Sequence, residues 1–176
     1  MALLADGAGG VSGGAAAAQR FIEYFSTELE LTPENLCSHF SRVEALLQGD
    51  QSAGDTTGIV VVADSTQLFG ASVGDSEAWF FPTEGEFVDL TSGQVRKPLL
   101  GSGSATAIPF SMEATSGILL LCSDGLHKYA DFVKIRERLR EQNFQSLPAD
   151  LADLARMPSG GFQDDLSIVA VLIEDL

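Results

Sequence analysis

Aspartates stand at three places where an apolar segment of this sequence meets a turn. Asp6 follows a short apolar run and precedes a glycine, Asp124 does the same after a longer run, and Asp164 and Asp165 lead into residues 166–173. A carboxylate at the end of a core strand is held rigidly and partly desolvated, which is costly unless a cation or hydrogen bonds compensate. Carboxylate oxygens are natural ligands of hard cations such as Mg²⁺ and Mn²⁺. A single Asp-Gly pair is more simply a turn, but three such places together indicate a metal centre.

Two other motifs are typical of different chemistry, but neither matches its pattern or context fully. The glycine-rich stretch 7–14 lacks a following Gly-Lys-Ser/Thr, and Ser12 stands where a dinucleotide fingerprint needs its third glycine. We expect these glycines to let the backbone approach another segment closely before the first helix. Residues 70–74 match the nucleophile-elbow pattern Gly-x-Ser-x-Gly, but they lie in a β-rich stretch instead of a strand–turn–helix. The chain has two histidines, so a Ser-His-Asp hydrolase is disfavoured.

Helices and strands must position the aspartates. Apolar residues at helical spacing predict helices over residues 14–29, 32–48, 131–142 and 148–156. The second helix has Thr32 as its N-cap, Pro33 at its first position and Gly49 as its stop signal. Its inward-facing residues should be Leu36, Phe40, Val43, Leu46 and Leu47.

β-branched and apolar runs predict the strands. Two hairpins are expected, one from residues 57–63 and 68–73 and one from 77–81 and 86–90. Buried strands are expected at 117–122 and 168–173. Residues 91–112 are rich in Gly, Ser, Thr and Pro and should form a long surface loop that borders the site. This mixture predicts a layered α+β domain.

Composition limits the class of protein. The chain has 176 residues, of which 45% are hydrophobic, so one domain over residues 1–176 with a real core is expected. Its net charge of −15 should repel nucleic acid and anionic membranes. Its apolar runs are far too short to cross a bilayer, and residues 1–10 lack the pattern of a signal peptide. A cytoplasmic protein is the simplest inference, with Cys37 and Cys122 packed in the core and forming no disulfide framework.

Four stretches resemble, in the same order, the metal-dependent protein serine/threonine phosphatases of the protein phosphatase 2C (PP2C) type. The first is Asp-Gly-Ala-Gly-Gly at 6–10, followed by an alanine-rich helix. The second combines Gly-Asp-Thr-Thr at 54–57 with Val-Gly-Asp-Ser at 73–76. The third is Ser-Asp-Gly-Leu at 123–126 after an apolar strand, and the fourth is Asp-Asp-Leu-Ser at 164–167 before one. Together these motifs span nearly the whole chain.

The resemblance implies a β-sandwich of two antiparallel sheets flanked by pairs of helices. It also implies hydrolysis of phosphoserine and phosphothreonine in phosphoproteins by a water activated by two Mg²⁺ or Mn²⁺ ions. Asp6, Asp124 and Asp164 would be the catalytic carboxylates. Asp6 would bridge both ions, the carbonyl of Gly7 would bind one, Asp124 and Asp164 would hold the other, and Asp75 would be a further ligand.

The sequence also departs from the family pattern. Ala8 stands where some branches have a histidine proposed as general acid, and Glu77 replaces the usual arginine after Gly-Asp-Ser. Lys128 stands where many members have an aspartate that helps to bind a third ion, which puts that ion in doubt, and Asp165 replaces an asparagine.

The start of the sequence differs as well. Family members have strands before the Asp-Gly block that carry a phosphate-binding arginine and an acidic ligand. Because Asp6 lies five residues after Met1, the expected fold is N-terminally incomplete. The alternative function is therefore a weakly active or inactive phosphatase-like module that binds or regulates.

Overall fold

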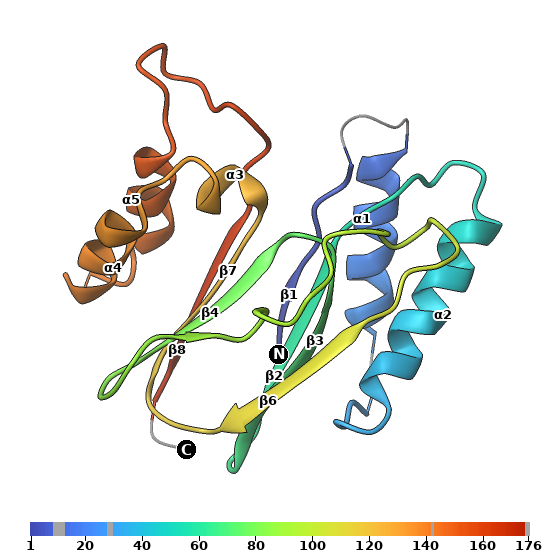
Figure 1. Ribbon diagram of the computed structural model, residues 1–176, viewed down its shortest axis with the longest axis horizontal. Coiled ribbons are helices and arrows are strands. Elements are labelled where there is room, and N and C mark those ends of the chain that lie inside the picture. The colour runs from blue at the N-terminus through green and yellow to red at the C-terminus, as the bar shows by residue number, and fades with distance from the viewer. Residues whose placement is uncertain (9–12, 28–29, 142, 175–176) are drawn as a thin grey trace.

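The computed structural model describes residues 1–8, 13–27, 30–141 and 143–174. In this part of the chain two antiparallel sheets of four strands lie face to face (Figure 1). The first sheet has the order β1 (Ala2–Leu4), β2 (Gly58–Ala63), β3 (Gln67–Val73) and β6 (Ile108–Glu113). The second has the order β5 (Val88–Asp89), β4 (Glu77–Pro82), β7 (Gly117–Cys122) and β8 (Ile168–Ile173).

Helices cover the outer faces of the sandwich. The first sheet is covered by α1 (Gly14–Phe25) and α2 (Leu36–Gly49), and the second by α4 (Phe132–Arg140) and α5 (Leu147–Leu154) (Figure 1). A short helix, α3 (Asp124–His127), follows β7 directly. The predicted α+β sandwich with flanking helix pairs is therefore confirmed.

Alternation along the strands explains the layers. In β7, Leu119 and Leu121 pack between the sheets, whereas Leu120 and Cys122 pack against the helices outside. Successive side chains of a strand point to opposite faces, so a strand covered on both sides is apolar throughout. This is why residues 117–122 read as an unbroken apolar run, and the predicted bounds of this strand are confirmed.

The two predicted hairpins are confirmed by their pairing, with Val60 opposite Ala71 and Phe80 opposite Val88. The start of the second helix was predicted wrongly. Thr32 and Asn35 form a turn in which the Thr32 N–H donates to Asn35 Oδ1 at 2.9 Å, and α2 begins only at Leu36.

Three further predictions were wrong. Leu46 is 56% exposed, because the inward face of α2 runs through Leu36, Phe40, Val43 and Leu47. Part of the expected surface loop forms β6, an edge strand. Proline is tolerated in an edge strand, as at Pro109, because its missing N–H can face solvent instead of a neighbouring strand. The last strand, β8, also lies at an edge and is only half-buried, with Leu172 48% exposed.

Both cysteines are free, Cys122 buried and Cys37 half-buried, which agrees with the prediction of no disulfide. Among the described residues, none of the helices is long and apolar enough to cross a membrane.

Candidate metal centre

Strand ends bring the aspartates to one end of the sandwich. The strands β1 and β3 are both antiparallel to β2, so they run in the same direction, and Asp6 and Asp75 follow their ends. The strands β7 and β8 are antiparallel neighbours, so the end of β7, which Asp124 follows, lies beside the start of β8, which Asp164 precedes. The fold thus places together the aspartates that the sequence places far apart.

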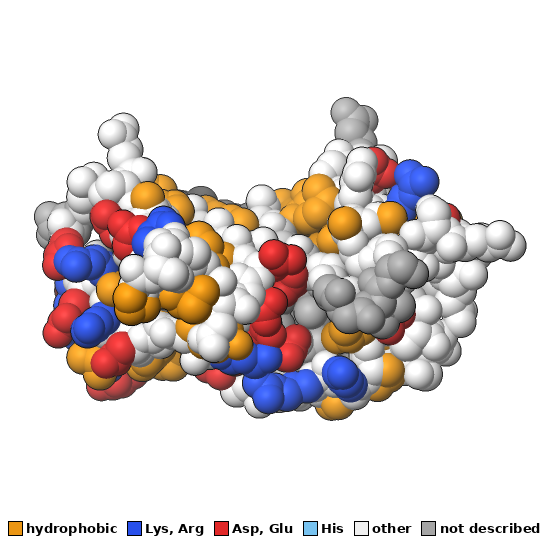
Figure 2. All heavy atoms as spheres, turned by 90° about the horizontal axis from the view of Figure 1, so that it is seen from above, with side chains coloured by type: hydrophobic (Ala, Val, Ile, Leu, Met, Phe, Trp, Pro, Cys, Tyr) orange, Lys and Arg blue, Asp and Glu red, His pale blue; other side chains and the backbone are white. Residues whose placement is uncertain are grey.

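The pKa of Asp6 shows how close these charges are. Burial raises it, and the negative charges of Asp124, Asp165, Asp164 and Asp75 raise it further, to about 6. Figure 2 shows acidic side chains gathered in the middle of this end of the molecule. Asp6 and Asp165 also line a hollow of about 540 Å³ here. Burial and repulsion among the carboxylates therefore both act on Asp6.

Hydrogen bonds fix the backbone of Asp6. Its carbonyl accepts from the Thr57 N–H at 2.8 Å and from Thr56 Oγ1 at 3.0 Å, and its N–H donates to Thr57 Oγ1 at 3.0 Å. The Thr57 hydroxyl also lies 2.7 Å from the hydroxyl of Ser76, which follows Asp75. Thr57 therefore ties the Asp6 segment to the segment that carries Asp75.

Two glycines allow α1 to approach Asp6. A side-chain carbon added to Gly7 would lie 2.3 Å from the carbonyl carbon of Gly14, so the backbones pack directly against each other. This confirms the expected close approach of the glycine-rich stretch at these two positions. Ser12 lies outside the described residues.

A second set of contacts brings Asp124 beside Asp165. The buried Ser123 donates its N–H to the Ser167 carbonyl at 3.0 Å and its hydroxyl to the Asp165 carbonyl at 3.1 Å. A side-chain carbon on Gly125 would overlap that same carbonyl oxygen. Glycine is thus required at the first turn of α3 for the two acidic segments to meet.

Lys128 supplies a positive charge inside the acidic cluster. Its Nζ lies 2.5 Å from Asp124 Oδ2 and 3.6 Å from Asp75 Oδ2. The hydrogen bond with Asp124 raises the pKa of Lys128. The ammonium group therefore partly neutralises the two carboxylates that flank it.

His127 had no predicted role, yet it links two parts of the site. Its Nε2 donates to the Asp75 carbonyl at 2.9 Å, and its Nδ1 lies 3.7 Å from Glu77 Oε1. Trp79 Nε1 donates to the other oxygen of Glu77 at 2.6 Å. Burial raises the pKa of Glu77. No local pattern in the sequence indicates this contact, because 52 residues separate His127 from Asp75.

Part of the predicted loop 91–112 borders the site. Leu100 and Thr56 exchange backbone hydrogen bonds of 3.0 and 2.9 Å, next to the Asp6 segment. Glu44 of α2 holds the continuation of this loop, since its carboxylate accepts N–H groups from Gly101, Gly103 and Ala105 at 2.5, 2.6 and 3.1 Å.

The donor set suits a hard divalent cation, although the ligands are not closed around one point. Among the described residues, no three Asp, Glu, His or Cys side chains lie close enough together to hold a metal ion as they stand. Asp164 is exposed, and its Oδ1 accepts the N–H of Asp165 at 3.0 Å. The chemistry still fits Mg²⁺ or Mn²⁺, because cations relieve the repulsion that raises the pKa of Asp6. Ligation by Asp6, Gly7, Asp75, Asp124 and Asp164 stays a prediction.

The nucleophile-elbow motif has no part in the site. Its serine, Ser72, is wholly buried inside β3, paired with strands on both sides. It cannot present its hydroxyl to a substrate as a nucleophile on a strand–turn–helix does.

The sandwich with flanking helix pairs has the fold of the PP2C-type serine/threonine phosphatases. Solved structures of such enzymes match 98% of this chain. A bacterial serine phosphatase has a TM-score of 0.83 at 19% identity, with 85% of its chain covered. The Staphylococcus aureus phosphatase Stp1 has a TM-score of 0.78 at 18% identity, with 83% covered.

A third similar structure is the catalytic domain of the serine/threonine phosphatase PstP, in complex with two manganese ions. Its TM-score is 0.78 at 22% identity, with 98% of this chain and 87% of that chain covered. No family model and no curated protein matches the sequence of this chain. The likeness to these phosphatases is therefore one of fold.

Proposed function

We propose that this chain is a hydrolase that removes phosphate from phosphoserine and phosphothreonine in proteins and that it uses Mg²⁺ or Mn²⁺. The observation that carries the proposal is the gathering of Asp6 with four other aspartates from three chain segments at one end of a phosphatase fold, where burial and then their negative charges raise the pKa of Asp6 to about 6. The two manganese ions of the PstP structure support the same chemistry for this fold.

The metal ligands would be Asp6, the carbonyl of Gly7, Asp75, Asp124 and Asp164. Divalent cations bound there would lower the pKa of a water molecule and neutralise phosphate oxygens. Asp6, Asp124 and Asp164 are the proposed catalytic carboxylates.

The remaining residues of the site hold this arrangement. Thr57 fixes the backbone of Asp6 by accepting its N–H, and Ser123 fixes the start of α3 beside Asp165. Lys128 places a positive charge where a phosphate group would otherwise meet carboxylates alone. Ala8 has no proton to donate, so the leaving oxygen would take its proton from water.

A second candidate function is a weakly active or inactive phosphatase-like module. The observation that favours it is the contact of Lys128 with Asp124, because an ammonium group at 2.5 Å competes with a metal ion for the same carboxylate oxygen. In that case the fold would bind a partner or regulate without turnover.

Hydrolysis of an aryl phosphate and of a phosphopeptide, with and without Mn²⁺, tests the proposal. The variants are Asp124→Asn and, as a matched control, Asp64→Asn. Asp64 lies in the turn between β2 and β3, at the end of β3 opposite to Asp75. Its carboxylate accepts backbone N–H groups there, which the side-chain oxygen of asparagine can also accept.

We expect Mn²⁺-dependent activity that a chelator abolishes. Asp124→Asn should lower this activity by about a hundredfold or more. Asp64→Asn should keep it within about twofold of the wild type, as a surface change does. Equal activity of the wild type and Asp124→Asn would sink the metal mechanism. Calorimetric binding of Mn²⁺ without turnover, or the lack of binding at millimolar Mn²⁺, would favour the inactive module.

A further inference from the structure

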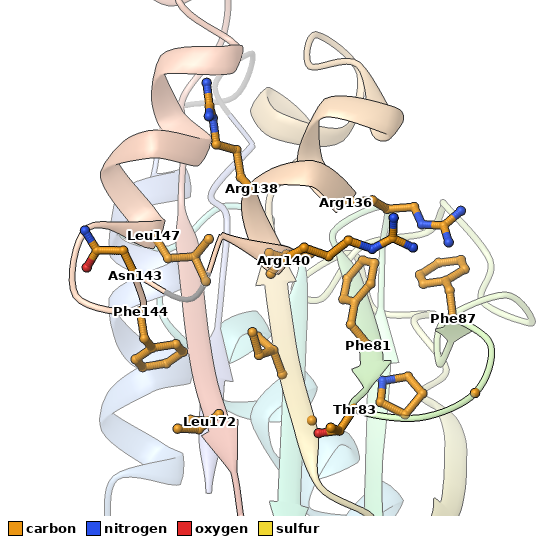
Figure 3. A pocket seen from close by; sticks show the side chains of 15 residues that line it. Phe81, Thr83, Phe87, Arg136, Arg138, Arg140, Asn143, Phe144, Leu147 and Leu172 are labelled. Carbon is orange, nitrogen blue, oxygen red and sulfur yellow. The ribbon is translucent and has the colours of Figure 1, made fainter.

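A second cavity lies at the other end of the second sheet. It has a volume of about 520 Å³ and lies between the outer face of β4, β7 and β8 and the helices α4 and α5 (Figure 3). It is lined by Gly117, the first residue of β7, whereas Asp124 follows the last. The six residues of β7 separate the two places by roughly 20 Å at about 3.3 Å per residue. This cavity is therefore not part of the acidic site.

The floor and sides of the cavity are apolar. Phe81, Ile118 and Phe144 line it and stay only partly buried, and Leu172 beside them is 48% exposed. Figure 3 shows Phe144 and Leu172 on one side and Phe81 on the other. Apolar side chains left in contact with water in a hollow gain free energy when an apolar group covers them, about 25 cal/mol per Å². A ligand for this cavity needs an apolar body.

One rim of the cavity is cationic. Helix α4 carries four of the ten Lys and Arg residues of a chain whose net charge is −15, and three of them, Arg136, Arg138 and Arg140, line the cavity. Arg136 and Arg140 extend from α4 in the same direction, toward Phe81 and Phe87, whereas Arg138 points away (Figure 3).

The three arginines also differ in their ion pairs. Arg138 forms an ion pair with Glu141 at 2.8 Å. Arg136 and Arg140 have no ion-pair partner within residues 1–8, 13–27, 30–141 and 143–174. Like charges four residues apart on a helix repel each other by about 0.2–0.5 kcal/mol. The macrodipole favours Arg140 in the last turn of α4 but does not explain Arg136 one turn earlier.

We propose that this cavity binds a small organic anion with an apolar body, such as an aryl or alkyl carboxylate, phosphate or sulfonate. The apolar body would lie on Ile118 between Phe81 and Phe144, and the anionic group would accept hydrogen bonds from Arg136 and Arg140. The volume of about 520 Å³ is in the range of small-molecule sites, and an apolar lining with a few polar groups at one side is typical of them. Because the chain as a whole is acidic, the two neighbouring guanidinium groups of Arg136 and Arg140 would make this cavity selective for an anion.

Fluorescence titration with two matched probes tests this site. The first probe is 8-anilinonaphthalene-1-sulfonate, an aryl anion, and the second is N-phenyl-1-naphthylamine, which has the same aromatic body without the charge. Both are titrated into the folded full chain in the presence of a chelator. The variants are the double change Arg136→Gln/Arg140→Gln, the matched control Arg138→Gln, and Leu172→Glu, which puts a negative charge on the floor.

The wild type should bind the anionic probe at one saturable site, about tenfold or more tighter than the neutral probe. The double change should weaken binding of the anion by about tenfold or more, whereas Arg138→Gln should leave it within about twofold. Leu172→Glu should weaken binding of the anion as well. Near-UV circular dichroism of each variant confirms that the fold is retained, as expected for side chains that are exposed or only partly buried.

Equal affinity for the two probes, equal loss in Arg138→Gln and in the double change, or the lack of saturable binding would overturn the proposal. Asp124→Asn, or Mn²⁺ in place of the chelator, should not change the titration, because the cavity lies at the opposite end of β7 from Asp124. The result is therefore independent of whether the chain is a phosphatase.

Discussion

Replacing Lys128 with methionine keeps the apolar stem of the side chain and removes its charge. The ammonium group lies 2.5 Å from Asp124 and 3.6 Å from Asp75, and its side chain is 36% exposed. At such exposure an ion pair contributes about 1 kcal/mol at most. Without metal we therefore expect Lys128→Met to lower the free energy of unfolding by about 1 kcal/mol, because the carboxylates then repel each other without compensation.

The same change should strengthen the binding of Mn²⁺. A divalent cation no longer displaces an ammonium group from Asp124, nor is it repelled by one nearby, and about 1.4 kcal/mol of relief corresponds to a tenfold lower Kd. Calorimetry should thus give a Kd for Mn²⁺ about tenfold lower than in the wild type. Thermal unfolding should show a lower Tm without metal and a larger rise of Tm on adding Mn²⁺.

Lys134→Met is the matched control, since Lys134 is exposed on α4 and has no ion pair among the described residues. It should leave the affinity for Mn²⁺ unchanged. An unchanged or higher Kd in a folded Lys128→Met protein would refute the reasoning. So would a fall in kcat/KM at unchanged affinity for Mn²⁺, because Lys128 would then act on the substrate instead of competing with the metal.

Three further perturbations probe the supports of the site. In chelator, the folded protein keeps a proton on Asp6 up to about pH 6, whereas the unfolded chain loses it near the ordinary pKa of 3.8. The Asp6 contribution to stability should therefore fall as pH rises from about 4 to about 6, and urea titrations should show that Asp6→Asn lacks this fall. Glu44→Gln should lower the free energy of unfolding by about 2–4 kcal/mol in urea titrations, because one of the two buried carboxylate oxygens that accept three N–H groups becomes an NH₂ donor and the charge is removed; a loss below about 0.5 kcal/mol would contradict this. Thr57→Val should cost about 1–3 kcal/mol and weaken Mn²⁺ binding by calorimetry, because the N–H of Asp6 loses its acceptor. Thr57→Ser should restore both, and an unchanged Kd in Thr57→Val would show that Thr57 does not position Asp6.

Periodicity predicted the elements whose patterns are strong. The apolar run 117–122 and the β-branched and apolar residues of the β2–β3 hairpin identify strands because covered faces must be apolar. The strand β6 was missed because its residues, Ile-Pro-Phe-Ser-Met-Glu, follow a loop-like segment and its stability comes from the neighbouring β3. The inward face of α2 was misjudged at Leu46 because helical spacing allows a wider apolar stripe than the packing uses.

The sequence alone singled out the aspartates of which the proposed site consists. Aspartates at strand ends are recognisable locally, because a carboxylate that follows an apolar run has to lie at the rim of a core. The close packing at Gly7 was foreseeable for the same local reason, since a glycine-rich stretch before a helix permits backbone contact.

Only the tertiary structure decided how these residues act on one another. The contacts of Glu44 with Gly101 and of His127 with Asp75 join residues 57 and 52 positions apart, and no local pattern specifies such partners. The position of Lys128 between Asp124 and Asp75 depends on α3 and on the meeting of two sheets. The raised pKa of Asp6 likewise exists only after the sandwich brings separate charges into one partly desolvated place, since Coulomb energies depend on distance and burial and not on order along the chain.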